Sequence, residues 1–146
     1  MKEFKLSKRS EKNIEGVRQS IITLVKRVLK KSPHDFGIPK YGGKRTPQEQ
    51  NDLYNSTTQD GKRLTWLDGY IKLSYHQSGN AFDIFIYDEH GACWKCIDKY
   101  QQVAQIFKKE FDLMKEEGLF KHDENIYWGG DWTKFKDLPH FEVKKY

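Results

Sequence analysis

The spacing of apolar positions along the chain predicts three helices. From Ser10 to Lys31 apolar residues recur every three or four positions, which is typical of an amphipathic helix with one buried stripe. A second helix begins at the capping box Thr46-Pro47-Gln48-Glu49, with proline at the first helical position, and ends near Ser56. The same helical spacing predicts a third helix from about Lys95 to Glu117, and Gly118 supplies its stop.

Other segments have the composition of buried strands. Ala81–Tyr87 is apolar on both faces and rich in aromatic and β-branched residues, which favours a strand inside the protein. Phe36 and Ile38 mark a short strand, and a final strand is expected around His140–Val143. Helices that come first, followed by strands mixed with one long helix, indicate an α+β domain.

Length and composition fit a single domain over residues 1–146, with 36% hydrophobic residues and a formal charge of +5. The basic residues are scattered, as on an ordinary solvated surface, and no base-reading motif accompanies them, so a nucleic-acid partner is not expected. No run of about 18 apolar residues could span a bilayer, so membrane insertion is not expected either. The N-terminus lacks the apolar stretch of a signal peptide, which predicts synthesis in the cytoplasm.

The two cysteines, Cys93 and Cys96, form a lone CxxC. A zinc ribbon would need a second pair, and the surrounding residues are not those of a redox motif. We expect reduced, non-catalytic thiols, with an auxiliary metal or redox role as the alternative.

Asp83 is unusual because it stands within the strand predicted over 81–87, where its apolar neighbours predict burial. A buried carboxylate is costly unless a cation or several donors compensate its charge, and an internal salt bridge is one way to do so. His76 lies seven residues earlier, and a turn at Gly79-Asn80 can fold it back beside Asp83. An imidazole and a carboxylate held together supply two ligands of a zinc site.

A third ligand should come from elsewhere in the chain, and His140 at the start of the last predicted strand is the best placed histidine. The other histidines, His34, His90 and His122, lie in polar loops. Three protein ligands plus a water is the coordination of catalytic zinc. Asp137 stands three residues before His140, where a hydrolytic site needs a carboxylate to take a proton from water and deliver it to the leaving amine. A surface aspartate ahead of a turn is the alternative.

Three further side chains have two readings each. Arg45 lies between a glycine loop and a helix start, where a cation can neutralise a substrate carboxylate or a developing oxyanion, or simply be an exposed structural arginine. Trp128 and Trp132 flank a glycine turn. Their side chains could form the walls of a substrate groove or could be ordinary core aromatics.

Three ordered motifs resemble those of one enzyme family. Ser74-Tyr75-His76-Gln77-Ser78-Gly79-Asn80-Ala81-Phe82-Asp83 is similar to the SxHxxGxAxD motif of the D-alanyl-D-alanine carboxypeptidase and L-alanyl-D-glutamate endopeptidase family of zinc peptidases, also called M15 or LAS enzymes. Asp137-Leu138-Pro139-His140-Phe141-Glu142 resembles the second motif, in which an acid lies three residues before the last ligand. Arg45-Thr46 with Gln50 matches the upstream RTxxxQ segment, and Asn13–Val17 resembles the opening of phage endolysin members. The likeness covers nearly the whole chain.

The resemblance implies a role for each matched residue. One Zn²⁺ would be held by His76, Asp83 and His140, and Asp137 would be the general base and acid. Arg45 would bind substrate or polarise the scissile carbonyl, with Ser74 and Gln50 as supporting pocket residues. The implied fold is the small α+β fold shared with the hedgehog signalling domain, in which an antiparallel sheet carries the zinc and packs with about three helices.

The resemblance also implies an activity. Asp137 stands where many D,D-peptidase relatives carry glutamate. An aspartate at this position is similar to phage endolysins, and it favours an L-Ala-D-Glu endopeptidase acting on peptidoglycan. A D,D-carboxypeptidase or dipeptidase with the same site, and a non-catalytic zinc-bearing wall-binding module, remain alternatives. We expect a monomeric catalytic domain with no separate cell-wall-binding domain, whose basic surface attracts anionic wall polymers. It would reach the wall through a separate pore-forming protein.

Overall fold

The computed structural model describes residues 3–134 and 136–145. Their helices are α1 (Lys8–Asn13), α2 (Gln19–Lys31), α3 (Pro47–Tyr54), α4 (Ile97–Glu116) and the short 3₁₀ turn η1 (Gly129–Asp131). Their strands are β1 (Phe36–Gly37), β2 (Ala81–Asp83), β3 (Phe85–Asp88), β4 (Gly91–Cys93), β5 (Glu124–Trp128) and β6 (His140–Lys145). None of these helices is long and apolar enough to cross a membrane.

The strands form two antiparallel sheets of three strands each, in the orders β1-β3-β4 and β2-β6-β5. The strand predicted over 81–87 is divided between them at Ile84, because the chain leaves the second sheet after Asp83 and joins the first at Phe85. The backbone N–H of Asp83 donates to the carbonyl of Gly42 rather than to a strand partner. The expectation of one continuous strand is therefore wrong, and the kink leaves Asp83 at the end of β2.

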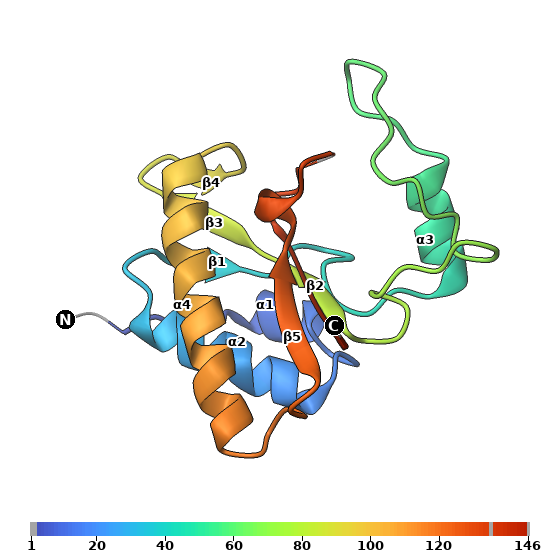
Figure 1. Cartoon of the computed structure of the whole chain (residues 1–146). Coiled ribbons are helices and arrows are strands. Elements are labelled where there is room, and N and C mark those ends of the chain that lie inside the picture. Colours follow the sequence, from blue (N-terminus) through green and yellow to red (C-terminus); the bar gives the residue numbers. More distant parts are fainter. Residues whose placement is uncertain (1–2, 135, 146) are drawn as a thin grey trace.

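The hydrophobic core lies between the sheets and the two long helices, α2 and α4, which pack against each other (Figure 1). Phe82 and Phe141 stack with ring centroids 5.3 Å apart, and Phe107 of α4 covers both. Phe82 and Phe141 are also direct partners in the β2–β6 register, so the next pair in that register is Asp83 opposite His140. Core packing thus sets the register that brings two site residues together.

The helix predicted over 10–31 is two helices. α1 ends at Asn13, and the chain turns at Gly16, whose φ of 84° is readily adopted only by glycine, before α2 begins at Gln19. Apolar residues continue through the break at helical spacing and are buried on both sides of it, so the pattern alone does not reveal the turn. With α1 counted separately, the described residues contain four α-helices rather than about three.

The break between α1 and α2 supports two loops that follow it in the chain, one at Gly43 and one at Gly79. The backbone N–H of Arg18 donates to the carbonyl of Gly79 at 3.0 Å. A Cβ atom at Gly43 would lie 2.1 Å from the carbonyl oxygen of Asn13, so only glycine allows this approach. The break in the first helix therefore positions the loops on which the site is built.

The predicted capping box is confirmed. The Thr46 side chain accepts from the N–H of Glu49, and the Glu49 side chain accepts from the N–H of Thr46. α3 and the loops after it stand apart from the rest of the molecule (Figure 1). Several large apolar side chains of this segment are exposed, among them Trp66, Tyr70 and Leu73.

The predicted α+β fold is confirmed, but the expectation for the cysteines is wrong. Cys93 and Cys96 form a disulfide that joins the end of β4 to the start of α4. The turn through Trp94 and Lys95 leaves their Cα atoms 6.0 Å apart, a separation that disulfides span. The two residues between them do not reveal this turn, because a CxxC spacing is also compatible with free thiols.

Candidate metal centre

Three side chains from different parts of the chain converge at the end of the second sheet. His76 belongs to the turn that precedes β2, Asp83 ends β2 and His140 begins β6. The turn expected at Gly79 is present: its φ is 78°, and its N–H donates to the His76 carbonyl. The two histidines are 2% and 7% exposed, so both rings are almost closed to solvent.

The facing atoms of the triad form a nearly equilateral triangle. The Nε2 atom of His76 lies 3.2 Å from Nδ1 of His140 and 3.3 Å from Oδ1 of Asp83. The Nδ1 atom of His140 lies 3.2 Å from the same carboxylate oxygen. Two ligand atoms bound at about 2.0 Å to one ion at the tetrahedral angle are about 3.3 Å apart. The three atoms therefore fit a single tetrahedral metal ion, and this triad could hold one.

Hydrogen bonds on the far side of each imidazole fix the atom that faces the centre. Nδ1 of His76 donates to the carbonyl of Gly43 at 2.8 Å, because a carbonyl oxygen can only accept. Nε2 of His140 donates to Glu142 at 2.8 Å. With these protons placed outward, each neutral ring presents a lone pair to the centre, as a metal ligand requires.

The charges of the centre favour a bound cation. Burial acts to raise the pKa of Asp83, but His76 and His140 hold it well below its ordinary value. Burial acts to lower the pKa of His140, yet the carboxylates of Asp83 and Glu142 raise it to about 9. The histidine thus gains from positive charge at this position, whether from a proton or from a metal ion.

Arg45 lies beside the triad and is not the exposed structural arginine of the alternative reading, because its side chain is only 12% exposed. Its Nη2 group donates to Asp83 Oδ2 at 3.1 Å, and its Nη1 group donates to Gln50 at 3.0 Å. Its Nε–H donates to the carbonyl of Tyr41 at 2.7 Å. Gln50 is fully buried and donates in turn to the Leu67 carbonyl, so it holds the guanidinium in place.

Asp137 is brought to the same place by a tight turn. Its backbone N–H donates to the Gly129 carbonyl, and its own carbonyl accepts from the N–H of His140 at 3.1 Å. Desolvation by the surrounding protein raises the pKa of its carboxyl to about 6, and the negative charge of Asp83 acts in the same direction. Its side chain is nevertheless exposed to solvent.

A comparison with protein families identifies the chain. Residues 2–145 match the model of the phage L-alanyl-D-glutamate peptidase family. The chain belongs to this family. The match covers the motifs of the triad, Arg45 and Asp137 together, and it confirms both the family and the peptidase class that the motifs predict.

Individual relatives agree with the family. The peptidoglycan L-alanyl-D-glutamate endopeptidase CwlK of Bacillus subtilis is 32% identical over 69% of this chain, and the chain spans only 57% of that protein's length. The L-alanyl-D-glutamate peptidase of Escherichia phage T5 is 28% identical over 97% of this chain and 90% of its own. The crystal structure of the L-Ala D-Glu endopeptidase ChiX of Serratia marcescens matches with a TM-score of 0.71 and 25% identity, covering 98% of this chain and 92% of that one.

The remaining predicted residues fall at different distances from the centre. Ser74 is buried, and its hydroxyl accepts from the backbone N–H of His76, so it supports the turn that carries this residue of the triad. Trp132 is half-buried, with its ring centroid 5.3 Å from that of His140. Trp128 is a core residue, 4% exposed, and its indole N–H donates to the Leu138 carbonyl behind Asp137.

Sequence reasoning missed the role of Glu142. This residue lies two positions after His140 on the same strand, so both side chains share one face, and that period of two was visible in the sequence. Its second oxygen accepts from Lys144 at 2.9 Å, and the Lys144 ammonium lies over the rings of Tyr75 and Tyr127. A chain of contacts therefore runs from the triad across β6 to β5.

Proposed function

We propose that the protein is a zinc-dependent endopeptidase that hydrolyses the bond between L-alanine and D-glutamate in the stem peptides of peptidoglycan. The observation that carries the proposal is the triangle of His76, Asp83 and His140, whose three facing atoms lie 3.2–3.3 Å apart in a chain of this family. Relatives from Bacillus subtilis, phage T5 and Serratia marcescens are each named for this bond.

Zinc is the ion that the donor set favours. Two imidazole nitrogens and one carboxylate oxygen, with a fourth position open, are the protein ligands of catalytic zinc in other hydrolases. Zinc in such a site lowers the pKa of a bound water to about 7 and polarises a carbonyl group as a Lewis acid. Gly43 and Glu142, which accept the outward protons of the two histidines, keep both rings in the orientation that binds the ion.

Asp137 is the residue that we assign to proton transfer. Its carboxylate takes a proton from the attacking water and passes it to the amide nitrogen as the carbon–nitrogen bond breaks. A pKa of about 6 in the protein suits both halves of this task near neutral pH. The turn from Gly129 to His140 fixes its carboxylate relative to the third ligand.

Arg45 is the residue that we assign to substrate binding and oxyanion stabilisation. Three of its N–H groups hold the oxygens of Tyr41, Gln50 and Asp83, and its other N–H groups are the donors for a substrate oxygen. In a buried position each such donor acts strongly on developing negative charge. Trp132, beside His140, is assigned to the wall of the substrate groove.

The +5 charge supports attraction of the protein to anionic wall polymers. The proposal also includes that the enzyme is a monomer and that it reaches the wall after release through a separate pore-forming protein. Binding to wall fragments should weaken as salt rises, because salt screens charge attraction. Sedimentation of the protein with purified walls at several salt concentrations tests this point, and salt-independent sedimentation contradicts it.

The activity is tested on purified peptidoglycan sacculi. We expect the zinc-loaded protein to release fragments with new D-glutamate amino termini, identified by mass spectrometry, and a chelator to abolish their release until zinc is restored. Asp137→Asn should bind zinc with unchanged affinity and lose at least 99% of the hydrolysis, since removing a general base costs about 10²–10⁴-fold.

The matched control is Glu89→Gln, which removes a carboxylate from an exposed turn and should leave the rate unchanged. Release of terminal D-alanine in place of D-glutamate termini would instead identify a D,D-carboxypeptidase. Near-full activity of Asp137→Asn would remove this residue from the mechanism.

A further inference from the structure

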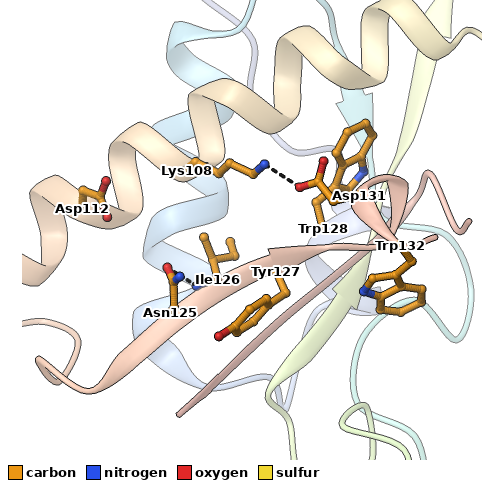
Figure 2. Close-up of a pocket in the computed structure, with 8 residues that line it drawn as sticks. All are labelled: Lys108, Asp112, Asn125, Ile126, Tyr127, Trp128, Asp131 and Trp132. Atoms are coloured by element: carbon orange, nitrogen blue, oxygen red, sulfur yellow. Dashed lines mark hydrogen bonds and ion pairs between the residues drawn. The ribbon is translucent and has the colours of Figure 1, made fainter. Parts of the chain in front are cut away.

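A polar pocket of about 550 Å³ opens along the free edge of β5 (Figure 2). Its volume lies within the range of about 300–1,000 Å³ that small-molecule sites occupy. Its lining comes from α4, β5 and η1, and consists of Lys108, Asp112, Asn125, Ile126, Tyr127, Trp128, Asp131 and Trp132. Of these residues, only Trp132 has a role in the proposed function above.

Two aromatic rings form the side of this pocket that faces the centre. Tyr127 lies opposite Glu142 in the β5–β6 register, so it shares the sheet face of the triad. Trp132 lies on the same side of β5 as Tyr127 in Figure 2, and its ring neighbours that of His140. Both rings are half-buried and offer an apolar surface next to polar groups.

Amide, carboxylate and ammonium groups complete the lining, and in Figure 2 Lys108, Asp112 and Asp131 lie on the opposite side of β5 from the two rings. Asn125 supplies an amide, Asp112 and Asp131 supply carboxylates, and Lys108 donates to Asp131 at 2.5 Å. Such a set can donate to and accept from several hydroxyl and acetamido groups at once. With two carboxylates against one lysine, the pocket does not favour an anionic ligand.

We propose that this pocket is a saccharide subsite, which receives the N-acetylated amino sugar of the glycan strand next to the scissile peptide. The inference rests on the proposed function, because the L-alanine of the stem peptide is amide-linked to the lactyl group of N-acetylmuramic acid. Residues after the scissile bond carry free carboxylates, whereas this sugar is neutral once its lactyl group is in amide linkage. Charge therefore assigns the pocket to the sugar side of the bond.

The distance from the metal centre agrees with this direction. One alanine and the lactyl group separate the scissile carbonyl from the sugar ring, and two such units span about 7 Å. Trp132, with its ring 5.3 Å from the ring of His140, lies within that reach, and Tyr127 of β5 lies on the same side of the strand in Figure 2. A sugar stacked on these rings would lie on the sheet face that Asn125 shares with Tyr127, two residues apart along β5.

Two measurements on the zinc-loaded protein test the subsite. The first compares kcat/KM for a muropeptide that carries the disaccharide with kcat/KM for the same peptide without sugar. We expect a preference of at least tenfold for the sugar-linked substrate, and a fall of this ratio by at least fivefold in Tyr127→Ala. Tyr87→Ala, which removes a partly exposed tyrosine from β3 in the other sheet, should keep the ratio of the unaltered protein.

The second measurement needs neither hydrolysis nor a variant. The probe is the N-acetylglucosaminyl-N-acetylmuramic acid disaccharide with its lactyl carboxylate capped as a methyl amide. In nitrogen–proton correlation spectra, its titration should shift the indole N–H signal of Trp132 and the amide signals of Asn125 and Tyr127. The signals of Trp94, in the distant β4–α4 turn, should not move.

Equal kcat/KM values for the two substrates, together with no shift at Trp132, would overturn the subsite. A shift produced by the sugar-free peptide but not by the disaccharide would also overturn it. Failure of the proposed function is distinguishable, because the sugar-free peptide would then release no D-glutamate terminus while the disaccharide titration still reports on the pocket.

Discussion

Replacing Glu142 by glutamine tests how much the hydrogen bond behind His140 contributes to metal binding. In the structure this carboxylate is 6% exposed and accepts from Nε2 of His140 at 2.8 Å. Burial acts against its charge, but hydrogen bonds from His140 and Lys144 hold the pKa of Glu142 below its ordinary value, so it is ionised at neutral pH. Glutamine keeps the shape and one accepting oxygen for His140, but it removes the charge and replaces the oxygen that accepts from Lys144 with an amide NH2 group.

The size of the effect follows from the kind of hydrogen bond that is lost. A bond to a charged group contributes about 1.5–3 kcal/mol, roughly twice the contribution of a neutral bond. Converting it to a neutral bond should therefore cost about 1–1.5 kcal/mol of metal binding, which is about tenfold in Kd. Glu142→Ala leaves the ring without its acceptor and should approach the upper end of the 10–100-fold range known for such partners.

The assay is a competition titration of zinc between the protein and a chromophoric chelator, with thermal unfolding of the metal-free protein as a check on folding. Glu124→Gln is the matched control, because Glu124 is also a buried glutamate of the same sheet, but it pairs with Arg18, far from the triad. It should lower stability and leave the zinc Kd unchanged. An unchanged Kd in Glu142→Gln, or an equal loss in Glu124→Gln, would refute the reasoning.

Two further predictions concern the stability of the fold and the turn from Gly129 to His140 that carries Asp137. The two hydrogen bonds from Arg18 lower the pKa of Glu124 from 4.5 to about 2, against the effect of desolvation. The pair therefore stabilises the fold at pH above about 4.5 and loses this contribution as pH falls towards about 2. In urea unfolding at pH 7, we expect the free energy of unfolding of Glu124→Gln to be about 2 kcal/mol lower than that of the original protein. This difference should vanish near pH 2. A difference that persists at pH 2 would mean that packing, not charge, is responsible. At the turn that carries Asp137, a Cβ atom on Gly129 would lie 2.2 Å from the carbonyl oxygen of Asp137. Gly129→Ala should therefore displace Asp137 and reduce hydrolysis of sacculi at least tenfold, while zinc affinity stays within twofold. Loss of zinc binding together with activity would show that the damage extends to His140.

The amino-acid sequence alone was enough to predict the three residues of the triad and several elements of the fold. His76, Asp83 and His140 stood out because a carboxylate among apolar residues requires a partner, and the motif spacing named the two histidines. The capping box at Thr46 and the regular stripe of the helix ending near Glu116 depend on neighbours within one turn of the chain. Such local interactions are read directly from sequence, since the residues that make them are adjacent in it.

The tertiary structure decided what depends on residues far apart in the chain. The breaks at Gly16 and Ile84 interrupt apolar patterns that continue without change, because contacts with Gly79 and Gly42 select the turns. Two further contacts likewise depend on how strands and turns are oriented, which residue spacing does not specify. They are the disulfide between Cys93 and Cys96 and the hydrogen bond from His140 to Glu142. Sequence patterns record which side chains prefer burial, but the register and path of the backbone follow from packing of the whole core.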